Sequence, residues 1–199
     1  SGPVQALFFN SELYAVDVGN HRVVVLPHQS ASPPAFSAAS RVVGQLGMDF
    51  NTVNLIEGKE LYLGGRGGVA VDTKSNPPRL YVADTFNNRV LGFRDARRVK
   101  TGDKADLVIG QDSLYRSEIN YPYKDSTWRN DMGLLFPTGL AVDANGDLFL
   151  ADSGNARVLR FPKPFEQTAT PPRANLVLGQ SSFVTRLTDA STRTMAAPY

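Results

Sequence analysis

The sequence contains no cysteine, two histidines and one tryptophan among 199 residues. The absence of cysteine excludes disulfide bonds and thiolate metal sites. No apolar run approaches the roughly 18 residues that a membrane-spanning helix needs. The start of the chain lacks the charged and apolar parts of a signal peptide, so we expect that any export signal was removed or never belonged to this chain.

An excess of charge of one sign is also missing. The chain has 21 Lys and Arg against 19 Asp and Glu, which gives a formal net charge of +2. A nucleic-acid-binding surface usually needs a clear basic excess, so this balance argues against one. A single local basic run is interpreted as a solvated hairpin loop, and it comprises Arg94, Arg97, Arg98, Lys100 and Lys104.

The sequence does contain a threefold internal repeat. The segments ELYAVDVGNHRVVVLP, RLYVADTFNNRVLGFR and DLFLADSGNARVLRFP, at 12–27, 79–94 and 147–162, align without gaps. Each is followed by a second element, RVVGQ, LVIGQ or LVLGQ, and GVAVD or GLAVD precedes the last two. Matching points in the first two elements are 66 to 69 residues apart.

Each repeat predicts four short strands. In the third unit we expect them at 139–143, 147–151, 157–161 and 175–179, with Asn145-Gly146 as the signal of a two-residue hairpin. Alternating and β-branched residues favour strand over helix. A repeated four-stranded antiparallel meander is a propeller blade, so the sequence predicts an all-β propeller fold.

The D-x-x-N-x-R-V core with GLAVD before it resembles the NHL repeat, and the added V-x-G-Q segment resembles long bacterial versions of that family. The resemblance implies one β-propeller domain over 1–199, with blades at about 1–55, 61–120 and 134–185 and with 186–199 leading into a further blade. Propellers have typically four to eight blades. We therefore expect half or a fragment of a roughly six-bladed ring, or self-association that completes one.

In such a meander, the turn between strands two and three shares one face with the link to the next blade. We therefore expect the turns at 17–21, 84–88 and 152–156 on the same face as the long loops at 46–67 and 112–138. Long loops on a rigid scaffold are where binding usually occurs.

The repeated Asp and Arg are the first candidate residues. They would line a charged site or form structural pairs, in which Asp caps the turn through backbone N–H groups and Arg braces blade to blade. Repetition in every blade favours the structural interpretation, because an active site is needed once. The pairs are Asp17 with Arg22, Asp84 with Arg89, and Asp152 with Arg157.

The loop at 115–131 holds the second set of candidates. Aromatic and Arg residues are enriched at binding hot spots, so Tyr121, Tyr123, Trp128 and Arg129 are the proposed ligand-binding residues, for a sugar or a peptide. In the preferred alternative, the loop folds back and its aromatic rings pack over the blade below.

No catalytic residue, metal or cofactor is predicted. A histidine-bound metal, on which the peptide-amidating lyases of similar fold rely, is disfavoured because His21 and His28 are the only histidines. His21 is expected to be solvated in its turn. Residues 143–147 resemble half a calcium loop, but a hairpin turn explains them better. The glycines at 64–68 do not form a dinucleotide motif, and are expected to let an inner strand enter a crowded centre.

We interpret the chain as a non-catalytic binding or scaffolding module that holds a protein, peptide or glycan on its long-loop face. The family resemblance and the absence of cysteine favour a bacterial protein that is secreted or at the cell surface. Two alternatives stay open. A propeller lyase or hydrolase would need ionisable groups that converge on the axis, where the inner strands offer Asp72 and Asp143 only at their ends. An RNA-binding NHL domain would need a continuous basic face.

Overall fold

The computed structural model describes residues 3–27, 38–53 and 55–199. In this part of the chain, three four-stranded sheets follow one another, and each is an antiparallel meander in chain order. This confirms the predicted all-β fold of three four-stranded repeats. The first sheet comprises β1 (Ala6–Phe9), β2 (Glu12–Asp17), β3 (Arg22–Pro27) and β4 (Arg41–Val43). The second comprises β5 (Val69–Asp72), β6 (Arg79–Asp84), β7 (Arg89–Phe93) and β8 (Leu107–Ile109). The third comprises β9 (Pro137–Val142), β10 (Leu148–Asp152), β11 (Arg157–Phe161) and β12 (Leu176–Leu178).

One turn recurs between the second and third strands of every sheet. It is a single turn of 3-10 helix, namely η1 (Val18–Asn20), η2 (Thr85–Asn87) and η3 (Ser153–Asn155). A left-handed residue ends each turn, with φ of 52° at His21, 51° at Asn88 and 57° at Ala156. A further 3-10 turn, η4 (Pro164–Glu166), follows β11.

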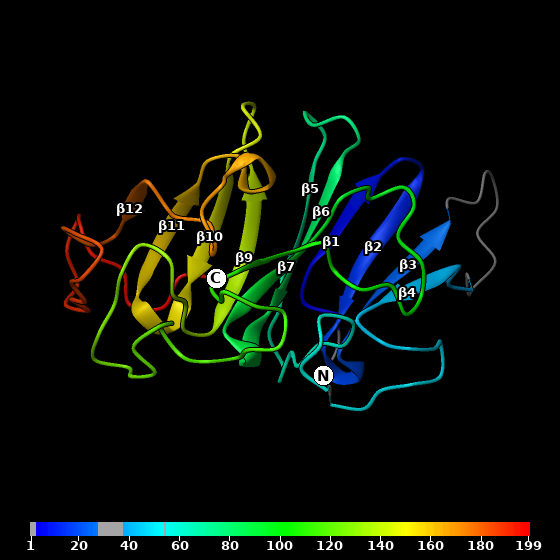
Figure 1. Ribbon diagram of the computed structural model, residues 1–199, viewed down its shortest axis with the longest axis horizontal. Helices are drawn as coiled ribbons and strands as arrows, with labels where there is room; N and C mark the ends of the chain where they lie inside the picture. The colour runs from blue at the N-terminus through cyan, green and yellow to red at the C-terminus, as the bar shows by residue number, and fades with distance from the viewer. Residues whose placement is uncertain (1–2, 28–37, 54) are drawn as a thin grey trace.

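The three sheets lie side by side (Figure 1). Their first strands meet, because β5 contacts β1 on one side and β9 on the other. The approach is close: a Cβ atom built on Gly68 would lie 2.2 Å from the carbonyl oxygen of Thr138. Only glycine allows this contact, which accounts for Gly68 directly before β5.

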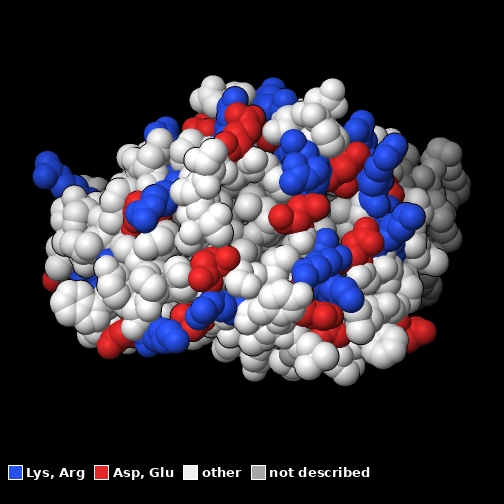
Figure 2. Space-filling model, viewed as in Figure 1, with Lys and Arg blue, Asp and Glu red and all other residues white. Residues whose placement is uncertain are grey.

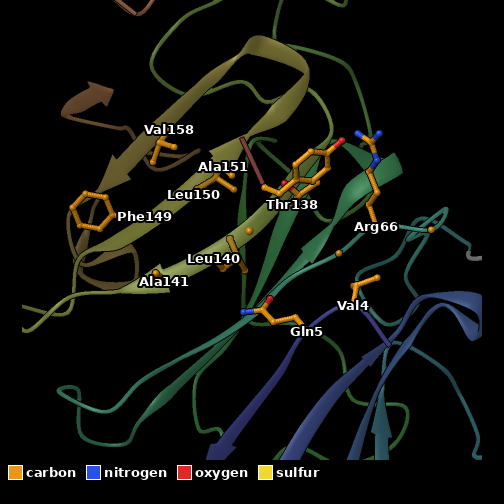
Figure 3. Close-up of a pocket in the computed structure, with 14 residues that line it drawn as sticks. Val4, Gln5, Arg66, Thr138, Leu140, Ala141, Phe149, Leu150, Ala151 and Val158 are labelled. Atoms are coloured by element: carbon orange, nitrogen blue, oxygen red, sulfur yellow. The ribbon is translucent and has the colours of Figure 1, made fainter. Parts of the chain in front are cut away.

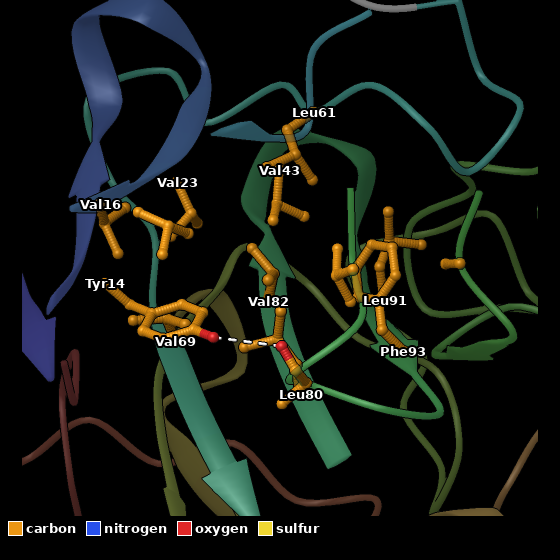
Figure 4. Close-up of a cluster of buried hydrophobic side chains, with 14 of the residues drawn as sticks. Tyr14, Val16, Val23, Val43, Leu61, Val69, Leu80, Val82, Leu91 and Phe93 are labelled. Atoms are coloured by element: carbon orange, nitrogen blue, oxygen red, sulfur yellow. Dashed lines mark hydrogen bonds between the residues drawn. The ribbon is translucent and has the colours of Figure 1, made fainter. Parts of the chain in front are cut away.

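Apolar side chains fill the space between neighbouring sheets. Tyr14, Val16 and Val23 of the first sheet pack against residues of the second, among them Leu80 and Leu91 (Figure 4). All five side chains are fully buried. The Tyr14 hydroxyl is satisfied there because it donates to the carbonyl oxygen of Ala96 at 3.1 Å. A second cluster joins the second and third sheets in the same way and includes Tyr81, Val90, Ile109, Leu148, Leu150 and Leu159.

The hairpin between β9 and β10 differs from the prediction. The N–H of Asp143 donates to the Asp147 carbonyl, and the N–H of Gly146 donates to the Asp143 carbonyl, so the loop has three residues. A two-residue type I′ turn needs positive φ at both central residues, and here Gly146 has a φ of 86° while Asn145 does not have a positive φ. The prediction of a two-residue hairpin at Asn145-Gly146 is therefore wrong, although the hairpin itself is present.

Candidate binding face

The long loops and the turns after the second strands lie on one face, as direct hydrogen bonds show. The guanidinium groups of Arg22, Arg89 and Arg157 each donate to a backbone carbonyl of the long loop that follows in the same repeat. Each carbonyl belongs to the third residue after the Gly-Gln pair. The three acceptors are Met48, Leu114 and Phe183.

Each of these arginines also forms an ion pair with the Asp that ends the preceding strand. The Arg Nε to Asp Oδ2 distance is 2.7 Å in both the second and the third sheet, where Asp84, Arg89, Asp152 and Arg157 are completely buried. In the first sheet the distance is 3.0 Å, and Arg22 and Asp17 remain 20% and 24% exposed.

These contacts correct one detail of the sequence interpretation and extend another. The Asp side chains make no cap hydrogen bond at the 3-10 turns. Instead, Asp84 accepts the backbone N–H of Tyr62, and Asp152 accepts that of Leu135, so each holds the segment that leads into its own sheet. Each arginine braces its turn to the long loop of its own repeat, and Arg157 also donates to the carbonyl of Gly133 in the loop that links the second sheet to the third. Burial raises the pKa of the Asp84 carboxyl, while Arg89 and the N–H of Tyr62 oppose the rise.

The glutamine of the V-x-G-Q motif holds the long loop at a second point, in addition to the arginine. We call this glutamine a clamp, because its side chain hydrogen-bonds both the turn and the loop. The Gln111 side chain donates to the carbonyl oxygens of Asn88 at 3.0 Å and Glu118 at 2.7 Å, and it accepts the N–H of Glu118 at 3.1 Å. Gln180 repeats all three bonds with Ala156 and Leu187. Both glutamines thus link the left-handed residue of the turn to the loop residue seven positions after the glutamine itself.

Gln45 keeps the two donor contacts, to His21 and Thr52, but its Oε1 atom is buried and has no hydrogen-bond partner among the described residues. The first copy of the clamp is therefore weaker than the other two. Together, the Arg and Gln residues explain why both motifs recur: they fix the first seven residues of each long loop.

The loop between β8 and β9 is held at further points. Asn120 is fully buried and accepts a hydrogen bond from the Asn155 side chain at 2.7 Å. The Asn130 side chain donates to the carbonyl of Tyr121 at 2.9 Å. Arg129 donates to the Asn155 side chain and to the carbonyl oxygens of Thr127 and Ser126.

With the loop held by these hydrogen bonds, two of the four predicted ligand-binding residues are exposed to solvent. Tyr123 is 50% exposed and Trp128 is 64% exposed, and their ring centroids are 6.3 Å apart at an interplanar angle of 47°. The preferred alternative, in which the loop aromatics pack over the blade, is wrong for this pair. Such exposure is unusual, because large aromatic residues are mostly buried.

The other two predicted residues have internal partners. The Tyr121 hydroxyl donates to Asp112 at 2.9 Å, and this hydrogen bond raises the pKa of Tyr121. Arg129 is half-buried, and its hydrogen bonds all serve the loop and the neighbouring turn. The structure therefore brings Tyr123 and Trp128 together and places Tyr121 and Arg129 among the supports of the loop.

A row of aromatic rings on the same face was not predicted. The centroid distances along it are 5.5 Å from His21 to Tyr62, 5.0 Å from Tyr62 to Phe86, and 5.2 Å from Phe86 to Phe136. Its members come from different places in the repeat. His21 ends a 3-10 turn and Phe86 lies within one, whereas Tyr62 and Phe136 lie in segments that lead into a sheet. Comparison of the repeats therefore gives no signal for the row.

His21 is half-buried and is not the solvated turn residue that we expected. Its Nδ1 atom accepts the N–H of Leu63 at 3.2 Å, and burial lowers its pKa. His28 lies outside the described residues. Within the described ranges, no group of three or more His, Asp or Glu residues is arranged to hold a metal ion.

The remaining charged candidates lie elsewhere. Asp143 accepts the N–H groups of Asn145 and Asp147 within its hairpin, and Asp72 accepts those of Lys74 and Ser75. Lys and Arg are interspersed with Asp and Glu over the face seen in Figure 2. The five residues of the basic run are all exposed, and Asp95 pairs with two of them, Arg97 and Arg98.

Three side-by-side antiparallel meanders with converging first strands define this protein as an assembly of β-propeller blades. Residues 134–161 match the family model of the NHL repeat, which confirms the resemblance drawn from the repeated motif. The third unit thus matches the NHL repeat, and the first two units carry the same Asp, Asn and Arg spacing.

A solved structure of a luciferin-regenerating enzyme is similar to this chain, with 11% sequence identity and a TM-score of 0.38. The alignment covers 88% of this chain and 61% of that enzyme, so the chain spans less than two thirds of the enzyme's length. A search of curated proteins finds no match. Among the described residues, no helix is long and apolar enough to span a membrane.

Proposed function

We propose that this chain is a non-catalytic binding module that holds a protein or peptide on its long-loop face. The displayed pair of Tyr123 and Trp128 supports the proposal. Two large aromatic side chains lie side by side in a loop and remain at least half exposed. Tyr and Trp are the residues that most often dominate the energy of protein interfaces.

The hydrogen bonds that hold the loop favour binding because they reduce the conformational entropy that the loop loses when a ligand binds. A loop that becomes ordered on binding loses conformational entropy, and this loss lowers the affinity. Here Asn120, Asn130 and Arg129 hold the loop through side-chain hydrogen bonds on both sides of the aromatic pair. The pair is thus presented on a largely preformed surface.

The geometry favours a protein or peptide over a glycan. The two rings are inclined by 47° and do not form one flat platform for the face of a sugar ring. Charged residues begin directly beside the pair, because Lys124 follows Tyr123 in the chain and contacts Glu118, which Arg116 also contacts. An apolar centre with a polar rim is the usual anatomy of a protein interface.

Trp128 is the only tryptophan, so its fluorescence reports on the proposed site directly. Random peptides displayed on phage are selected against the immobilised protein, and the enriched peptides are synthesised and titrated. We expect them to change the Trp128 emission. The Trp128→Ala variant should bind at least about 2 kcal/mol more weakly, or about 30-fold in Kd, measured by calorimetry.

Tyr115→Ala provides the matched control, because Tyr115 is 66% exposed in the same long loop but is not part of the pair. This variant should bind the selected peptides like the unmodified protein, while Tyr123→Ala should weaken binding. The proposal fails if no peptide is enriched, or if the enriched peptides bind Trp128→Ala with unchanged affinity.

A further inference from the structure

The outer face of the third sheet continues the contact that joins the other sheets. Tyr14, Val16, Val23 and Val43 of the first sheet are at most 1% exposed, because the second sheet covers them. The residues at the same repeat positions in the second sheet are likewise buried against the third. In the third sheet these positions hold Phe149, Ala151, Val158 and Leu178.

In the part of the chain that the structure describes, no fourth sheet covers this face. Leu178 is 40% exposed, whereas its equivalents Val43 and Ile109 are 1% and 0% exposed. Phe149 and Val158 are half-buried. They line a cavity of about 630 Å³ beside β9 and β10 (Figure 3).

The last residues occupy the place from which a further sheet would begin. A Cβ atom on Gly44 would meet Leu61, one on Gly110 would meet Leu134, and one on Gly179 would meet Met195. Leu61 and Leu134 belong to the segments that lead into the second and third sheets. Met195 therefore marks the equivalent lead-in position on the third sheet.

The free face of the first sheet provides the complementary half of the contact. Leu80, Val82 and Leu91 of the second sheet are fully buried against the first. Their equivalents on the first sheet are Leu13, Ala15 and Val24. Leu13 is 38% exposed, and Ala15 and Val24 are half-buried. One chain thus carries both halves of the sheet-to-sheet contact, one at each end.

We propose that a second copy of this chain docks the free face of its first sheet onto the free face of the third sheet. The contact repeats the one that joins sheets within the chain, and apolar positions meet apolar positions. Two such contacts related by a two-fold axis would join six sheets and leave neither end face uncovered. Six lies within the usual range of propeller blades.

Light scattering coupled to size-exclusion chromatography tests the proposal at micromolar concentration. The unmodified protein should elute with twice the 21.6 kDa mass of the chain. Leu178→Glu and Leu13→Glu each place a charge on one end face, and each variant alone should elute as a monomer. Both side chains are already partly exposed, so circular dichroism should show unchanged strand content. Leu55→Glu, at a loop residue that is 72% exposed, is the control and should remain a dimer.

Mixing the two variants distinguishes this contact from others. The Leu13→Glu chain keeps an intact third sheet and the Leu178→Glu chain keeps an intact first sheet, so the mixture should form a heterodimer through one contact. If Leu13→Glu alone stays dimeric while Leu178→Glu does not, two identical faces meet and the proposal is wrong. A monomeric unmodified protein also overturns it and leaves the end faces to a different partner. If a glutamate variant unfolds, the same comparison is made with glutamine at that position.

Discussion

Replacing Arg89 with methionine removes a buried cation and leaves the buried Asp84 carboxylate without its counter-charge. Arg89 and Asp84 are completely buried, and Arg89 also donates to the carbonyl oxygen of Leu114. Loss of one member of a buried ion pair typically costs about 3–5 kcal/mol. Since small proteins are stable by only about 5–15 kcal/mol, this is a large part of the total.

The first sheet provides a matched control. Arg22 forms the equivalent pair with Asp17, but both side chains are partly exposed to water. Exposed pairs contribute about 0.2–1 kcal/mol, so Arg22→Met should destabilise the protein far less than Arg89→Met. We expect the two variants to differ by roughly 2–4 kcal/mol in urea unfolding followed by circular dichroism at 25 °C.

A double variant separates the charge from the hydrogen bonds. Asp84→Asn combined with Arg89→Met retains an acceptor for the N–H of Tyr62 but leaves no buried charge. It should be more stable than Arg89→Met alone. Equal destabilisation by Arg22→Met and Arg89→Met would refute the reasoning, because burial would then not determine the effect.

Two pH effects follow from the structure. Burial lowers the pKa of His21 from 6.5, so the folded state favours the neutral ring, and stability should be lost as the pH falls below 6.5. His21→Asn, which introduces the residue found at position 88, should reduce this loss between about pH 7.5 and 5.5 in thermal unfolding. Arg41 lowers the pKa of Glu12 from 4.5 through two hydrogen bonds of 2.5 and 2.7 Å. This stabilisation is present above pH 4.5 and should fade as the pH falls further, and Glu12→Gln should show less acid sensitivity. Unchanged pH profiles in either variant would contradict these assignments.

Internal repetition made the fold predictable from the sequence. The Asp, Asn and Arg spacing marks the turn between the second and third strands, and the strands predicted at 139–143 and 147–151 correspond to β9 and β10 within two residues at each end. The hairpin loop between them was less predictable. Asn-Gly is compatible with both a two-residue and a three-residue loop, and the backbone of Asn145 decides between them.

The roles of the motif residues were only partly predictable. Repetition indicated a structural pair but not its partners, because the Asp bonds a segment 17 to 22 residues upstream. The Arg reaches a carbonyl 25 or 26 residues downstream in the sheets where the pair is buried. Local sequence patterns give no information about contacts at such separations. The Gln of V-x-G-Q is visible as a repeated residue, but the motif does not indicate which turn and loop residues its side chain bonds.

The candidate site was likewise only partly predictable from the sequence. The composition of the loop at 115–131 identified Tyr123 and Trp128, but it did not separate them from Tyr121 and Arg129. That distinction depends on which side chain finds an internal partner, and Asp112 and Asn155 supply those partners. The aromatic row from His21 to Phe136 is assembled from segments more than 100 residues apart and had no local signal.

Amide hydrogen exchange tests most directly whether the repeated motifs fix the long loops on the candidate binding face. The N–H groups of Glu118 and Leu187 donate to Gln111 and Gln180, so both should exchange slowly although they lie outside the strands. In Gln111→Met, exchange at Glu118 should accelerate at least about tenfold, equivalent to about 1.4 kcal/mol, while Leu187 keeps its rate. Fast exchange at both positions in the unmodified protein, or an unchanged rate at Glu118 in the variant, would contradict the account.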